Sequence, residues 1–312
     1  MRSLRARGGS VLLAVCVATS VQAASSRGTV GFQFLRSTWT PRPAAMAGAF
    51  VAVPGDLAGA SCNPAAAAEA PDNTLQASFM NHVLDFASGC LAYSHDLGSL
   101  ARGQFTVAAM SYGRFNETDL SGLPTGRTFG AGTIVVSETV ARRVLAGLLT
   151  GVNLKYVHSY IDTYSSQAVV LDAGVVFHTP IQDLDVGAAV QNVGKVLSPF
   201  VHIKDRLPLC YRLGWSKRLA HLPLLYSVEA FKYVDDDFQL AIGGEFTVTP
   251  QVFLRWGYST LSRQMKVGTE ADQLAGISLG VGFRWRKYHF DYSFSSLGQI
   301  GSVNRFGLTA GF

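Results

Sequence analysis

The end of the chain, residues 302–312, reads SVNRFGLTAGF and alternates between two kinds of side chain. Apolar residues occupy every second position at Phe306, Leu308, Ala310 and Phe312. The positions between them are polar or small, at Arg305, Gly307, Thr309 and Gly311. Successive side chains of a strand point to opposite faces, so this pattern predicts a strand with one apolar and one polar face.

The same alternation recurs along most of the chain, for example over residues 277–286 and 288–295. We count about 14 such segments, separated by turn-rich pieces. They start near residues 75, 89, 103, 128, 143, 167, 182, 206, 224, 238, 250, 273, 287 and 302. The pattern predicts an all-β chain.

The apolar faces favour a transmembrane antiparallel β-barrel over a soluble β-sandwich or secreted β-protein. They are rich in Phe, Tyr and Trp, and the segments run to about 10 to 14 residues, longer than the five or six typical of soluble strands. The chain also ends on Phe312, which is similar to the aromatic ending that the barrel-assembly machinery reads in outer-membrane barrels.

Composition agrees with a barrel wall. Of the 312 residues, 48% are hydrophobic and 15% are charged, and 32 are glycine. Ordinary soluble domains carry about 25% charged residues. We find no internal run of about 18 apolar residues, which excludes a multi-helix membrane protein.

The predicted connections are long on one side and short on the other. Long ones span residues 113–127, 159–166, 194–205 and 259–272, whereas residues 179–181, 249–250 and 286–287 form short turns. Outer-membrane barrels have short periplasmic turns and longer extracellular loops. An even number of strands then places both termini in the periplasm of a bacterial outer membrane.

Residues 1–23 have the layout of a signal peptide, with Arg2, Arg5 and Arg7 ahead of the apolar stretch 11–21 and cleavage after Ala23. A buried helix and a lipoprotein signal ending at Cys16 are the alternatives. Removing three arginines from 26 basic residues leaves 23 against 21 acidic ones. No block of like charge remains, which argues against a nucleic-acid partner.

Motifs for chemistry are absent. The sequence holds no Gly-x-Ser-x-Gly, His-Glu-x-x-His or phosphate-loop motif, so we predict no enzyme, no catalytic residue, no metal and no cofactor. Cys62, Cys90 and Cys210 form no Cys-x-x-Cys pair, and a disulfide among them stays open.

Residues 24–74 do not fit a strand, because they contain five prolines and the small-residue run 65–68. Ahead of a barrel over residues 75–312, they either fold inside it as a plug, hang in the periplasm, or form a flexible linker. Small residues favour the plug, since it must pack against a crowded wall.

Residues 43–53, PAAMAGAFVAV, carry a more specific motif when taken with the polar positions after them. Its members are Met46, Gly48, Phe50, Asp56, Asn63, Pro64 and Ala65. This run resembles the N-terminal signature of FadL-like barrels, in particular the PorV/PorQ branch and related uncharacterised treponemal proteins. Residues 246–251, 254–258, 280–284, 290–294 and 297–298 are similar to the same branch. Ala47 and Cys62 depart from the pattern.

The resemblance implies an outer-membrane channel for hydrophobic molecules such as long-chain fatty acids, gated by the plug. It also implies an alternative, a PorV-like component that holds cargo for a protein-secretion system. Charges of both signs lie on the predicted inward faces, where neighbours can pair across strands. The candidates to face a ligand carboxylate or the plug are Arg212, Arg255, Arg284, Arg286, Asp291 and Arg305.

Overall fold

The computed structural model describes residues 30–312 except for 84–85, 99–100, 266–267 and 269. The predicted signal peptide, residues 1–23, lies outside the described residues.

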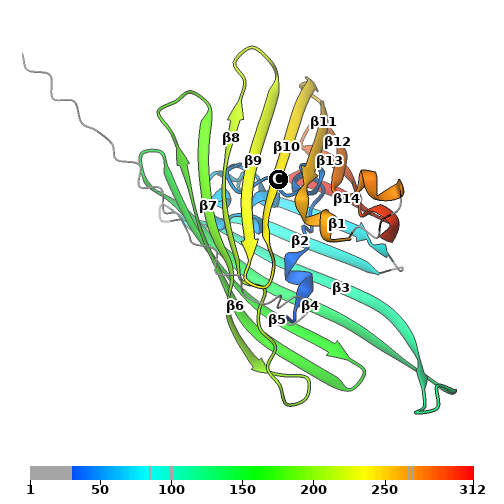
Figure 1. Ribbon diagram of the computed structural model, residues 1–312. Coiled ribbons are helices and arrows are strands. Elements are labelled where there is room, and N and C mark those ends of the chain that lie inside the picture. Colours follow the sequence, from blue (N-terminus) through cyan, green and yellow to red (C-terminus); the bar gives the residue numbers. More distant parts are fainter. Residues whose placement is uncertain (1–29, 84–85, 99–100, 266–267, 269) are drawn as a thin grey trace, which may run out of the picture.

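Fourteen antiparallel strands form one closed barrel, in which β1 pairs with both β2 and β14 (Figure 1). The strands are β1 (Thr74–Asn81), β2 (Ala87–Asp96), β3 (Arg102–Thr118), β4 (Pro124–Leu145), β5 (Leu148–Ile161), β6 (Tyr164–His178), β7 (Leu184–Ser198), β8 (Cys210–Arg218), β9 (Leu224–Tyr233), β10 (Phe238–Thr249), β11 (Val252–Ser259), β12 (Ile277–Trp285), β13 (Tyr288–Ser296) and β14 (Ser302–Gly311). The predicted barrel of about 14 strands is confirmed.

Closure places both ends of the barrel at one rim, because Thr74 of β1 lies opposite Gly311 of β14. We call this edge the terminal rim and the opposite edge the far rim. The β10–β11 and β12–β13 turns lie at the terminal rim, and the two longest connections, from β7 to β8 and from β11 to β12, begin and end at the far rim.

The outer face of the wall is apolar. On β11, Leu254 and Trp256 are 50% and 42% exposed, whereas Phe253 and Arg255, which alternate with them, are buried. Neighbouring strands repeat this split with exposed Leu279 on β12 and Phe290 on β13. A wall of this kind turns half of its side chains to lipid and half to the lumen. Among the described residues, no helix is long and apolar enough to cross a membrane.

Two predicted loops are wrong. Residues 113–127 mostly extend β3 and β4, which are joined by residues 119–123, and residues 159–166 extend β5 and β6 up to the turn at 162–163. A register shift between Ser111 and Arg114 lets the polar, glycine-containing sequence stay paired. Asp162 adopts a positive φ of 55°, which permits the tight turn. Figure 1 shows these strands projecting beyond the rest of the wall at the far rim.

Residues 30–73, the N-terminal segment, lie inside the barrel as short helices joined by turns. These are η1 (Gln33–Arg36), α1 (Pro41–Ala45), η2 (Leu57–Ser61) and η3 (Pro64–Glu69). Asp56 and Asn63 cap η2 and η3, since their side-chain oxygens accept the backbone N–H of Ala58 at 2.8 Å and of Ala65 at 3.1 Å. Met46 and Phe50 are fully buried.

Inward-facing glycines let this segment approach the wall. A Cβ built on Gly257 would lie 2.4 Å from the carbonyl carbon of Met46, and one on Gly243 would lie 2.6 Å from the Met46 oxygen. The glycines that face the segment in this way are Gly151, Gly174, Gly187, Gly214, Gly243, Gly257, Gly280 and Gly307. They span β5 to β14, and they account for part of the high glycine content.

Candidate functional site

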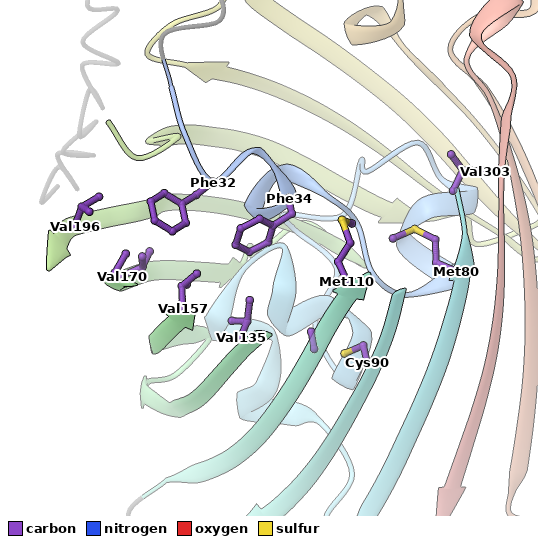
Figure 2. Close-up of a cluster of buried hydrophobic side chains, with 12 residues drawn as sticks. Phe32, Phe34, Met80, Cys90, Met110, Val135, Val157, Val170, Val196 and Val303 are labelled. Carbon is purple, nitrogen blue, oxygen red and sulfur yellow. The ribbon is translucent and has the colours of Figure 1, made fainter. Parts of the chain in front are cut away.

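A cluster of buried apolar side chains lies in the far-rim half of the lumen. Figure 2 shows Phe32 and Phe34 of the N-terminal segment projecting toward inward residues of the wall, with Val135, Val157 and Met110 around Phe34. The whole cluster comprises Phe32, Phe34, Met80, Cys90, Ala108, Met110, Val135, Val157, Ala168, Val170, Val196 and Val303. An apolar molecule against this cluster would therefore contact hydrocarbon.

Beside this cluster lies a cavity of about 470 Å³, which we call the aromatic pocket. Its aromatic rings come from the N-terminal segment, from strands β3 to β5 and from two connections, and are Phe32, Phe34, Phe86, Tyr112, Phe115, Phe129, Tyr160 and Phe200. The hydroxyls of Thr133 and Ser159 in its wall bond to each other at 2.9 Å. Because these polar groups satisfy one another, the pocket offers mainly apolar surface to a ligand.

The N-terminal segment and the β7–β8 connection close the pocket together. Gly31 donates its N–H to the Arg206 oxygen at 3.0 Å, and Val30 forms a parallel bridge with Arg206. The register shift between Ser111 and Arg114 lies next to Tyr112, which lines the pocket. The pocket is thus bounded by a loop, a segment end and an irregular strand.

Closer to the terminal rim than the apolar cluster, Glu229 of β9 binds the N-terminal segment to the wall through hydrogen bonds. One carboxylate oxygen accepts the N–H groups of Phe50 at 3.0 Å and Val51 at 2.9 Å. The other accepts Arg212 Nε at 2.5 Å, and Arg212 Nη2 donates to the Gly48 oxygen at 2.8 Å. Because Glu229 is fully buried, these contacts replace the water that its carboxylate would otherwise bind.

Asn63 supplies a second fastening. Its side-chain amide donates to the Val51 oxygen at 2.7 Å within the segment and to the Val175 oxygen of β6 at 2.9 Å. A Cβ built on Gly174 would lie 2.0 Å from Asn63 Oδ1. Docking of Asn63 therefore requires a glycine at position 174 and the Val175 carbonyl as a hydrogen-bond acceptor.

A third attachment, the Arg42 cluster, is made of charged residues and joins the segment to β10, β11 and β13. Arg42 lies 2.6 Å from Asp56 Oδ2 and 2.7 Å from Glu245 Oε2. Arg255, whose side chain is wholly buried, contacts the same Glu245 oxygen at 2.6 Å and Asp291 Oδ1 at 2.5 Å. Two guanidinium groups thus share three carboxylates across the boundary between segment and wall.

The structure brings some predicted lumen residues inward and not others. Arg212, Arg255 and Asp291 face the segment as above, and Arg305 donates to the Thr38 oxygen at 2.8 Å. Cross-strand pairing of the inward charges is also observed at Lys155 and Asp172, 2.6 Å apart.

The placement of Arg286 in the lumen is wrong, and Arg284 is only at its edge. Arg286 forms the β12–β13 turn with a φ of 55°, and its guanidinium lies 5.5 Å from the Trp285 ring centre. The alternating pattern extends to Arg286, but strand β12 ends at Trp285. Arg284 is exposed at the terminal rim, with its guanidinium 5.0 Å from the Phe253 ring centre.

The remaining predicted positions also have defined surroundings. Phe312 is 77% exposed and donates its N–H to the Asn73 oxygen at 3.0 Å at the terminal rim. Cys62, Cys90 and Cys210 are buried free thiols. Within the described ranges, no group of three or more His, Cys, Asp and Glu is placed to hold a metal ion.

Sequence reasoning missed Arg42 and the aromatic pocket. Arg42 is the only charged residue between Arg36 and Asp56 and stands between two prolines, which is a signal that it is held in place. The rings of the pocket come from residues 32 to 200, and no local pattern connects them.

Three solved structures share this fold. A FadL homologue from Pseudomonas aeruginosa is 14% identical over 88% of this chain and 98% of its own, with a TM-score of 0.55. The Pseudomonas putida toluene transporter TodX is 11% identical over 88% and 97%, with a TM-score of 0.55. The CymD monoaromatic hydrocarbon channel is 11% identical over 88% and 97%, with a TM-score of 0.58.

No protein-family model matches the chain, and no curated protein matches its sequence. At identities this low, the likeness to the three structures shows the fold alone. That fold is the one expected from the resemblance to FadL-like barrels.

Proposed function

We propose that this protein is a channel of the bacterial outer membrane for hydrophobic compounds. The observation that carries the proposal is the aromatic pocket of about 470 Å³ at the far rim, inside a barrel whose outer face is apolar. An apolar ligand gains free energy by leaving water for such a pocket. Two of the similar structures are a toluene transporter and a monoaromatic hydrocarbon channel, which supports this class of ligand.

In this proposal the N-terminal segment is the plug that gates the channel. It packs against the inner face of the barrel wall, and it is held there by Glu229, Asn63 and the Arg42 cluster. A ligand in the aromatic pocket touches the plug at Phe32 and Phe34.

The orientation follows from the same proposal. With the pocket open to the outside, the far rim is extracellular, and the terminal rim with both chain ends is periplasmic. Phe312, exposed at the end of β14, is then the residue presented to the barrel-assembly machinery.

Uptake into proteoliposomes tests the proposal. Labelled long-chain fatty acid and toluene are offered to vesicles that contain the wild type, Phe129→Ser, or the matched control Phe79→Ser. Phe129 lines the pocket, whereas Phe79 is 51% exposed on the outer face of β1. Removing a partly buried ring costs about 1.5 kcal/mol, so we expect about tenfold weaker uptake for Phe129→Ser alone. Uptake of neither compound by the wild type would overturn the proposal.

The resemblance to the PorV/PorQ branch supports a second candidate, in which the barrel holds cargo for a secretion system. The same preparation separates the two candidates. Co-purification of a secreted protein, together with no uptake of either compound, would favour the accessory function. Fatty-acid uptake that exceeds toluene uptake would narrow the ligand class of the channel.

A further inference from the structure

A second, smaller cavity of about 180 Å³ lies at the terminal rim, between the N-terminal segment and strands β10 to β14. Its lining includes Asp56 and Arg42 of the segment and Glu245, Arg255, Arg284 and His289 of the wall. It is less than half the volume of the aromatic pocket, and its lining is charged rather than aromatic. A ligand here would be a small polar group rather than an entire hydrophobic molecule.

The carboxylates of this cavity are already engaged. Asp56 and Glu245 are held by Arg42, and Arg255 bridges Glu245 and Asp291. These contacts neutralise the acidic groups without using every donor of the basic ones.

Three basic side chains of this cavity can still bind a further acceptor. Arg255 Nη2 is buried and has no hydrogen-bond partner among the described residues. His289 Nε2 is also buried, and it lies 3.7 Å from Asp291 Oδ1, too far for a hydrogen bond. Arg284 forms no ion pair within the described part of the chain and rests against the Phe253 ring.

Two features of the wall position these basic side chains. A Cβ built on Gly282 would lie 2.8 Å from Arg255 Nη2, so the bare glycine leaves room for the guanidinium. Arg284 and His289 are cross-strand partners on β12 and β13, which places them on the same rung of the sheet. Both arginines line the cavity, Arg255 with a wholly buried side chain and Arg284 with an exposed one.

We propose that this cavity is an oxyanion-binding site, in which Arg284, Arg255 and His289 bind a carboxylate or phosphate group. Arg255 Nη2 and His289 Nε2 are buried without partners, which is costly, and an oxyanion supplies acceptors for both of them and for exposed Arg284. A guanidinium fork binds two oxygens at once, which suits both groups. The site lies at the opposite end of the lumen from the aromatic pocket and is independent of the proposed channel function.

Calorimetric titration of the full chain in phosphatidylcholine nanodiscs tests the site. The probes are inorganic phosphate, acetate and octanoate, with heats into empty nanodiscs subtracted. Arg284→Gln is compared with Arg286→Gln, which removes the same charge two residues away and outside the cavity. We expect at least tenfold weaker binding for Arg284→Gln, unchanged binding for Arg286→Gln, and an intermediate affinity for Arg284→Lys.

Two sources of the oxyanion are distinguished by the probes. Octanoate that binds at least tenfold more tightly than acetate indicates the head group of an amphipathic ligand, whereas equal affinities indicate a free anion. Heat-dependent gel migration verifies that each variant is folded. The same affinity in Arg284→Gln as in the wild type, or no binding of any probe by the wild type at millimolar concentration, would overturn the site.

Discussion

Replacing Glu229 with glutamine should release the N-terminal segment from the wall. The carboxylate accepts two backbone N–H groups of the segment and the Arg212 guanidinium, and it is fully buried. A glutamine side chain at this position would keep one acceptor oxygen but would leave Arg212 as a buried charge without a carboxylate partner. Breaking a buried ion pair in this way costs about 3 to 5 kcal/mol.

The lower figure, about 3 kcal/mol, corresponds to about a hundredfold rise in the population of undocked segment, at 1.4 kcal/mol for each factor of ten. Cys62 reports this population, because it belongs to the segment and is only 2% exposed when docked. Burial also raises the pKa of the Cys62 thiol, so the docked form holds little reactive thiolate.

The assay is maleimide labelling of Cys62 in a background where Cys90 and Cys210 are serine. We expect the labelling rate of Glu229→Gln to rise about a hundredfold over that of the background protein, as the shift in population requires. Glu138→Gln is the matched control, since Glu138 contacts His95 and not the segment. Equal labelling rates in Glu229→Gln and Glu138→Gln would refute the reasoning, because the Glu229 contacts would then not hold the segment.

Three further predictions use the same preparation. Asn63→Ala removes a buried amide that bridges Val51 and Val175, and we expect about 1 to 3 kcal/mol of lost docking energy, seen as faster Cys62 labelling. Gly257→Val introduces a Cβ 2.4 Å from the Met46 carbonyl carbon, so we expect the segment to stay undocked while the barrel still migrates as a folded species on gels. Burial lowers the pKa of His82, in the β1–β2 connection, from 6.5 to about 4. The folded state then binds fewer protons than the unfolded state, so heat stability should fall as the pH drops from about 6.5 to about 4, and His82→Gln should reduce that fall.

Much of the wall could be predicted from alternation, because lipid on one side and the lumen on the other impose a period of two on every strand. The starts of β9, β10 and β14 fall at the predicted residues 224, 238 and 302. Strand ends are harder to predict. The stretch 113–127 is polar and contains glycine, yet it stays paired beyond the register shift, so its composition resembles that of a loop.

Some residues of the candidate site could likewise be predicted from the sequence, and others could not. The motif positions Asn63 and Asp56 could be identified from the sequence, and the structure shows them as helix caps. The contact between Arg42 and Glu245 joins residues 203 positions apart, and only closure of the barrel brings them together. Arg286 is misplaced by the sequence pattern because counting alternate residues gives no information about where a strand turns.

The glycine positions that face the N-terminal segment also constrain the order of assembly. Pro41 and Ala45 are among the first residues of the described chain, whereas the bare positions that receive them, Gly307 and Gly280, are on β14 and β12. Contacts between the two ends of a chain form late, because they require the whole intervening loop to close. Strands β12 and β14 must therefore be in place before the segment can finish packing. Docking of the segment against Gly307 therefore requires the last strand of the barrel.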